Sequence, residues 1–219
     1  MFQEHAPDVP ERRQNGKTGR RLTLPAQTRF LMTETWNVSL QPVLPEELPD
    51  FAANLQNAFS IAVRETFGTT EPVPSDEELK RSFSAKGAHI LHVVLHGRRV
   101  GGVVVVIDEK TQHNTLELFF ISPEHHARGL GFAAWKAVEN AYPDTVTWTT
   151  FTPYFEQRNI HFYVNKCGFH IVEFFHRGHR DPHMPPLQNA SASDPGTETY
   201  FRFEKVMKRP AQAQAPARP

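Results

Sequence analysis

Two glycines near the middle of the chain lie where they could bind a phosphate. Gly129 and Gly131 stand between an apolar segment, residues 115–121, which predicts a buried strand, and a segment of helical periodicity, residues 130–141. A glycine loop that opens onto a helix presents unpaired backbone N–H groups and the positive end of the helix dipole, which together favour anions. Taken alone, the pattern fits a tight strand-to-helix turn without a ligand equally well. The surrounding residues have to decide between the two interpretations.

The histidines and the single cysteine offer two other kinds of chemistry. His176, His179 and His183 are close enough in sequence to bind a metal, but no regular element is predicted there to fix them. We therefore expect a polar loop and no metal site. Cys167 lies beside a glycine at the end of a predicted helix, and we expect a buried structural thiol rather than a nucleophile.

The elements that must position these residues follow from the hydrophobic periodicity. Strands are predicted at residues 36–44, 88–95, 100–107, 115–121, 145–150, 169–175 and 198–207. Helices are predicted at residues 45–67, 75–83, 130–141 and 153–166. The second helix begins with a capping box formed by Ser75 and Glu78. The three strands before the glycine loop form an antiparallel meander, and the helix after the loop should bring residues 145–150 parallel to residues 115–121.

The composition indicates which partners the charge balance disfavours and in which cellular compartment the chain is expected. The 219 residues carry 24 basic and 24 acidic side chains, so the charge balance favours neither nucleic acid nor a membrane surface as a partner. No apolar run is long enough to span a bilayer. A single cysteine excludes an intramolecular disulfide and favours a reducing, cytoplasmic location. We expect one domain at residues 36–208, an N-terminal disordered arm or extension at 1–35 and a disordered tail at 209–219.

Two motifs in this order resemble those of the GNAT superfamily of acyl-CoA-dependent N-acetyltransferases. The first is Gln/Arg-x-x-Gly-x-Gly/Ala, which corresponds to residues 126–131, His-Ala-Arg-Gly-Leu-Gly, with histidine in the first position. The second is a helix that carries Asn159 and Tyr163, followed by a Gly-Phe pair at 168–169 that starts a strand. The resemblance covers about residues 36–208. It implies an α/β (α+β) fold of the GNAT type: a mixed, mostly antiparallel twisted sheet of about seven strands with one central parallel pair and flanking helices.

The resemblance also implies a role for each part of the site. Acetyl-CoA is the co-substrate, and its acetyl group passes directly to a bound amine without an acyl-enzyme and without a metal. Tyr163 is the expected general acid, which protonates the departing thiolate, and Asn159 contacts the pantetheine arm of CoA. The same arm pairs with the free strand edge at Phe119, Phe120 and Ile121, where a backbone N–H near Phe120 polarises the thioester carbonyl. The pyrophosphate is bound by the backbone N–H groups of His126, Ala127, Arg128, Gly129, Leu130, Gly131 and Phe132.

Glu117 is the candidate general base, acting directly or through a water. It is the only carboxylate in an otherwise apolar strand, and burial there would raise its pKa towards the working range. The alternative for Glu117 is a carboxylate on the wet face of the sheet, or one paired with a neighbouring strand. For Tyr163 the alternative is a core aromatic residue on an amphipathic helix.

The acceptor amine is the part of the reaction that the sequence leaves open. In the fold that the chain resembles, residues 66–83 and 176–197 build the acceptor site, and we expect a small-molecule or peptide amine there. A homodimer is also left open. Two other classes of function compete: a catalytically degenerate module that binds acyl-CoA as a sensor, and a nucleotide-binding protein that uses the loop for another phosphate. The second lacks a Walker lysine and a Rossmann three-glycine run.

Overall fold

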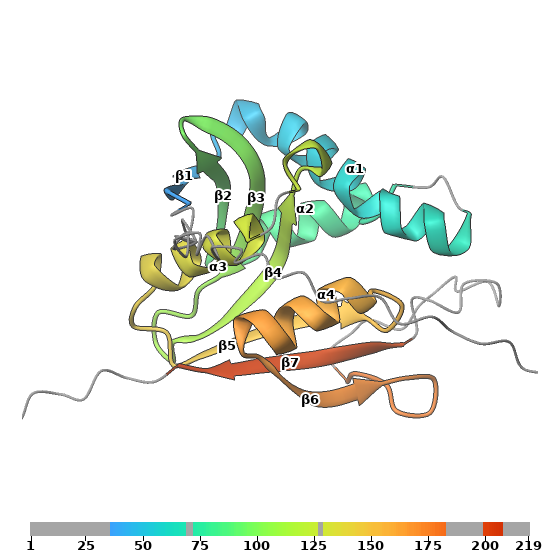
Figure 1. Cartoon of the computed structure of the whole chain (residues 1–219). Coiled ribbons are helices and arrows are strands. Elements are labelled where there is room, and N and C mark those ends of the chain that lie inside the picture. Colours follow the sequence, from blue (N-terminus) through green and yellow to red (C-terminus); the bar gives the residue numbers. More distant parts are fainter. Residues whose placement is uncertain (1–35, 69–71, 127–128, 183–198, 208–219) are drawn as a thin grey trace, which may run out of the picture. The chain divides into compact units, whose positions relative to one another are not determined.

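The computed structural model describes residues 36–68, 72–126, 129–182 and 199–207 (Figure 1). The predicted arm at residues 1–35 and the predicted tail at residues 209–219 lie outside the described residues, so the domain limits stay predictions. Within the described ranges, no helix is both long enough and apolar enough to cross a membrane.

Seven strands form one mixed sheet in the order β1-β2-β3-β4-β5-β7-β6. The strands are β1 (Val38–Pro42), β2 (Ala88–Leu95), β3 (Arg98–Val106), β4 (His113–Ile121), β5 (Thr147–Pro153), β6 (His170–Phe175) and β7 (Tyr200–Val206). Of the strand pairs in the described chain, β4–β5 is parallel and the others are antiparallel. The meander of β2, β3 and β4 and the single central parallel pair confirm the predicted fold class.

The helices connect and cover these strands. They are η1 (Pro45–Glu47), α1 (Leu48–Phe67), α2 (Asp76–Ser84), η2 (Pro123–His125), α3 (Leu130–Ala141), α4 (Gln157–His161) and the π-helical η3 (Phe162–Cys167). The capping box of α2 is confirmed, because Ser75 N donates to Glu78 Oε2 at 2.8 Å and Glu78 N donates to Ser75 Oγ at 3.3 Å. The predicted start of a helix at residue 153 was wrong. Pro153 pairs with Tyr200 and prolongs β5, so the helix begins at Gln157.

Three successive valines of β3 show how the layers are arranged. Val104 packs in the cluster that includes Phe51 of α1 and Leu79 of α2. Val103 and Val105 pack in the cluster that includes Trp135 of α3 and Tyr163 of η3. Successive strand residues point to opposite faces, so α1 and α2 cover one face of the sheet and α3 and η3 the other (Figure 1).

Gly102 of β3 allows α1 to lie close against the sheet. A Cβ at this position would lie 2.3 Å from a ring carbon of Phe51 and 2.6 Å from a ring carbon of Phe120. The two rings meet edge to face, with centroids 5.5 Å apart. The sequence predicts either a bulge or a close approach at the glycine pair 101–102, and the structure shows both. The close approach is at Gly102, and the missing side chain there leaves the space that the Phe51 and Phe120 rings occupy. The bulge is beside Gly101, because Val93 pairs with Gly101 and Val94 pairs with Arg99.

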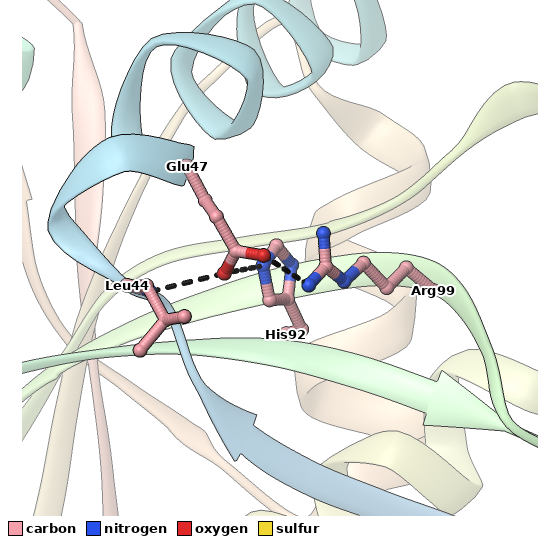
Figure 2. Close-up of polar contacts among 4 residues, drawn as sticks. All are labelled: Leu44, Glu47, His92 and Arg99. Atoms are coloured by element: carbon pink, nitrogen blue, oxygen red, sulfur yellow. Dashed lines mark hydrogen bonds and ion pairs between the residues drawn. The ribbon is translucent and has the colours of Figure 1, made fainter.

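Glu47 fixes the start of α1 to the sheet (Figure 2). Its carboxylate accepts hydrogen bonds from Leu44 N at 3.0 Å, from the Arg99 guanidinium and from His92 Nε2 at 3.3 Å. The hydrogen bonds from Leu44 and Arg99 lower the pKa of Glu47. His92 is only 7% exposed and packs edge-on against Phe51, and burial lowers its pKa. The folded state therefore favours an ionised Glu47 and a neutral His92.

The parallel pair of β4 and β5 is short. Residues 113–115 pair with residues 147–149, and at the next step the Thr150 hydroxyl donates to the Leu116 carbonyl at 2.9 Å. On its other side, β4 remains paired with β3 as far as Ile121. The edge of β4 that faces β5 therefore carries no strand pairing in the described chain from Leu116 onward. Such an edge offers N–H and C=O groups to an extended ligand.

Candidate active site

A cavity of about 400 Å³ opens beside this free edge of β4. Its walls come from α1, the end of β4, the loop before α3 and the segment from Phe155 to Tyr163. Phe67 at the end of α1 meets Phe155 edge-on, with ring centroids 4.9 Å apart, so α1 and the segment before α4 touch at one wall. The predicted site residues that line the cavity are Phe119, Phe120, Ile121, His126, Gly131, Asn159 and Tyr163.

The predicted phosphate loop leads into the N-terminus of α3. Gly129 has a φ of +97°, a conformation that other residues rarely adopt, and it directly precedes the helix. Among the described residues no side chain caps the helix, and Ala133 N donates to Gly129 O at 2.9 Å. The N–H groups of the three residues before Ala133 have no partner within the helix, because the helix begins with them. This end of α3 can therefore bind an anion.

The other members of the predicted loop differ in their surroundings. His126 Nε2 donates to the Ile121 carbonyl at 2.9 Å, so its ring lies against the free edge of β4. The histidine that departs from the Gln/Arg pattern thus has a local partner in the cavity. Leu130 is buried and Phe132 is exposed, and neither side chain lines the cavity. Ala127 and Arg128 lie outside the described residues.

Tyr163 lies at the inner end of the cavity on η3. Its side chain is 7% exposed, and its ring packs against Phe162, Phe169 and Phe203. Burial raises the pKa of Tyr163, and the Thr150 hydroxyl only partly offsets this effect. The phenol therefore stays protonated at physiological pH. The ring belongs to a core cluster, as one sequence interpretation expects, and it also lines the cavity. A role for Tyr163 as general acid stays a prediction.

Glu117 does not have the surroundings that the sequence suggests. The residue is exposed and is absent from the cavity lining, so its expected burial was wrong. The reason is a bulge: Val104 pairs with Leu118 and Val105 pairs with Leu116, which leaves Glu117 as the extra residue of β4. Its Oε1 accepts a hydrogen bond from Ser82 Oγ of α2 at 3.1 Å. A catalytic role for Glu117 stays a prediction.

Glu156 is a carboxylate of the cavity that the sequence did not single out. It is half-buried in the turn between β5 and α4, and its Oε2 accepts a hydrogen bond from Asn159 Nδ2 at 3.3 Å. Burial raises the pKa of Glu156, and the charge of Arg158 partly opposes this. The sequence predicts a helix over residues 153–166, and Glu156 would be an ordinary carboxylate in its first turn. The spacing of three residues between Glu156 and Asn159 could have indicated that the two side chains interact.

The histidines of the 176–183 segment and Cys167 are the other candidates for chemistry that the sequence offers. His179 Nε2 bonds to Glu173 Oε1 at 2.9 Å, and His176 Nδ1 accepts a hydrogen bond from Gly178 N at 3.1 Å. His183 lies outside the described residues, and the described ones contain no group of three potential metal ligands. Cys167 is buried, as expected, and burial raises its pKa to about 12, so its thiol is inert.

Comparisons with known structures show many proteins of the same fold. The ribosomal-protein-S18-alanine N-acetyltransferase of Escherichia coli has a TM-score of 0.56 and 13% identity, covering 81% of this chain and 99% of that one. The spermidine N-acetyltransferase of Vibrio cholerae, in complex with CoA and spermine, has a TM-score of 0.55 and 13% identity, covering 78% and 96%. A GNAT acetyltransferase of Elizabethkingia anophelis with acetyl-CoA bound has a TM-score of 0.53 and 12% identity, covering 78% and 99%. At these identities the likeness establishes the fold.

Sequence comparisons establish the family. The "Uncharacterized protein YrkN" of Bacillus subtilis (strain 168) is 51% identical over 177 residues, which cover 78% of this chain and 95% of that protein. The sequence model of the Acetyltransferase (GNAT) family matches residues 55–169, a segment that runs from α1 through the glycine loop to the start of β6. The chain therefore belongs to the GNAT family of acetyltransferases.

Proposed function

We propose that this enzyme transfers an acetyl group from acetyl-CoA to a primary amine, by direct attack while both substrates are bound. The observation that carries the proposal is the cavity itself, which brings together the free edge of β4, the start of α3 and Tyr163. An amide-rich arm such as pantetheine can pair with a free strand edge. A pyrophosphate suits the N-terminus of α3. The residues present therefore fit acetyl-CoA as the co-substrate.

The roles of individual residues extend the proposal. A backbone N–H near Phe120 hydrogen-bonds the thioester oxygen and stabilises the negative charge that develops there during attack. Asn159, which lines the cavity, contacts the pantetheine arm. Tyr163 protonates the sulfur as the carbon–sulfur bond breaks. Burial disfavours the phenolate, so the phenol is protonated before the reaction. The buried Cys167 has no part in this scheme, so no acyl-enzyme forms.

The acceptor is an amine of a small molecule or a peptide. One structural neighbour is named for spermidine and another for an alanine of ribosomal protein S18, so the fold serves both kinds of acceptor. The identity of the amine for this chain is therefore a matter for a substrate panel. A cytoplasmic location and a homodimer also stay predictions from the sequence.

A second candidate is a catalytically degenerate module that binds acyl-CoA without transferring the acyl group. The exposure of Glu117 favours this second candidate, because Glu117 is the general base that the sequence predicts and its expected burial is not observed. The two candidates predict the same binding of acetyl-CoA and differ in turnover. Turnover with an amine separates them.

Thermal unfolding with added ligands tests the binding part of the proposal. Acetyl-CoA at about 100 times its dissociation constant should stabilise the fold by about 2.7 kcal/mol and raise the melting temperature. ATP and NAD at the same concentrations should leave the melting temperature unchanged. A shift with ATP and none with acetyl-CoA would overturn the proposal in favour of another phosphate ligand.

A further inference from the structure

Two carboxylates line the cavity among the residues that the structure describes, and their surroundings differ. Glu65 is exposed on α1, whereas Glu156 is half-buried in the turn between β5 and α4. Glu117 of β4 is outside the lining. Of these three carboxylates, Glu156 alone is both partly withdrawn from water and part of the cavity wall that Tyr163 shares.

The backbone around Glu156 is held on both sides. Its N–H donates to the Pro153 carbonyl at 3.1 Å, and its carbonyl accepts from Ile160 N at 3.0 Å. The neighbouring Phe155 packs on Phe67 of α1. The carboxylate itself receives a hydrogen bond from Asn159, which is the donor found for it among the described residues. One hydrogen bond leaves a carboxylate able to accept others, so Glu156 can still bind a donor in the cavity.

We propose that Glu156 is the group that binds the acceptor ammonium and removes its proton before attack. The proposal rests on the acetyl transfer proposed above. Several apolar residues line the same cavity, including Ala58, Phe59 and Ile61 of α1. An ammonium that enters among them loses water and gains a carboxylate, which favours transfer of the proton. The acceptor class that fits is a cationic primary amine on an apolar stem.

The protons balance in this scheme. The bound ammonium gives one proton to Glu156 and becomes a neutral amine. Its nitrogen forms a bond to the thioester carbon, the carbon–sulfur bond breaks, and the sulfur takes the proton of Tyr163. The second nitrogen proton restores the Tyr163 hydroxyl, and Glu156 releases its proton to solvent. The products are an amide, free CoA thiol and one proton.

Burial makes Glu156 a stronger base than an exposed glutamate. Its pKa is raised by burial, with an opposing effect of the Arg158 charge. Other titratable groups in the cavity lining are Glu65 of α1, His126 of the loop and Tyr163 of η3. Because several ionisable groups share the cavity, the pH profile is compared between variants rather than read from the wild type alone.

The test compares the Glu156→Gln variant with wild type in the pH dependence of kcat, by thiol release with an amine that the wild type accepts. The wild-type rate should level off once Glu156 is ionised. The kcat of the variant should be about 100-fold lower at neutral pH and should rise steadily with pH, because only amine that is already neutral reacts.

The Glu156→Asp variant, which keeps a carboxylate, should retain the plateau at a reduced rate. Glu109→Gln, at an exposed carboxylate in the β3–β4 turn, is the matched control and should behave as wild type.

Two readouts guard against a merely structural effect. The melting temperature of Glu156→Gln and its shift with acetyl-CoA should match those of wild type, because the proposed role concerns the amine. The proposal is overturned if Glu156→Gln keeps the plateau, if its acetyl-CoA shift is lost, or if Glu117→Gln loses the plateau instead. A wild type that binds acetyl-CoA but acetylates no amine contradicts the proposed function as well, which distinguishes the two failures.

Discussion

The Tyr163 phenol is held in place and kept neutral. Its ring packs against three aromatic neighbours, and burial disfavours the phenolate by raising the pKa. The Tyr163→Phe variant keeps the ring and removes the proton. We predict that kcat for acetyl transfer falls about 100-fold, within the range for loss of a general acid, whereas the acetyl-CoA thermal shift is retained. Thiol-release kinetics check this, and wild-type turnover in the variant would show that Tyr163 is only a core residue.

Individual residues also show where sequence reasoning succeeds and where it fails. Asn159, Tyr163 and residues 119–121 line one cavity, and the motif order and the resemblance pointed to all of them, although their roles stay predictions. The burial of Glu117 was wrong because a bulge depends on how β4 pairs with β3, which alternation along one strand does not reveal. Glu156 was missed because its place in the cavity depends on α1, β4 and the loop before α3, which are far from it in the sequence and form the rest of the lining. Burial of a single carboxylate is thus a non-local property.

At the scale of elements, Glu47, His92 and Arg99 join the start of α1 to β2 and β3 (Figure 2). The pKa of His92 is lowered from its ordinary 6.5 and that of Glu47 from its ordinary 4.5. For both groups the unfolded chain binds protons more readily. Their contribution to stability is therefore present above the ordinary pKa values and is lost as the pH falls, first for His92 below 6.5 and then for Glu47 below 4.5.

The His92→Gln variant tests the first part of this dependence. We predict that the free energy of unfolding of wild type falls between pH 6.5 and 5, and that the variant shows a smaller fall over the same range, as measured by urea unfolding. His113→Gln, at an exposed histidine of β4, is the control and should follow wild type. An identical pH dependence in His92→Gln and wild type would contradict the role of the cluster.

The contact between α1 and the sheet gives a second prediction at this scale. Gly102→Ala would place a methyl group 2.3 Å from a ring carbon of Phe51, a side chain buried in the core. We predict a loss of about 1–3 kcal/mol in the free energy of unfolding, typical of an overpacked core. Turnover should fall as well, because Phe120 lines the cavity. Wild-type stability in denaturant unfolding would show that α1 can shift without cost.

For the whole molecule, the order of strands and helices was predictable, because each element has its own hydrophobic periodicity. The two motifs then relate that order to a known fold. The single parallel pair followed from one crossover helix, α3, between β4 and β5. The β5–α4 boundary was not predictable, since Pro153 stays in the sheet only because β7, from the end of the domain, pairs with it. The cavity lies where β4 and β5 no longer pair, beyond Thr115 and Thr149. No local sequence pattern indicates where this pairing stops.

Release of CoA thiol from acetyl-CoA in the presence of an amine panel tests the central claim most directly. The panel should hold polyamines, amino acids, aminoglycosides and peptides with free N-termini, with product mass as the second readout. We predict that at least one cationic primary amine gives thiol release, saturates with concentration and gains one acetyl group. A protein that acetyl-CoA stabilises against heat, but that releases no thiol with any amine of the panel, would contradict acetyl transfer and identify an acyl-CoA-binding module.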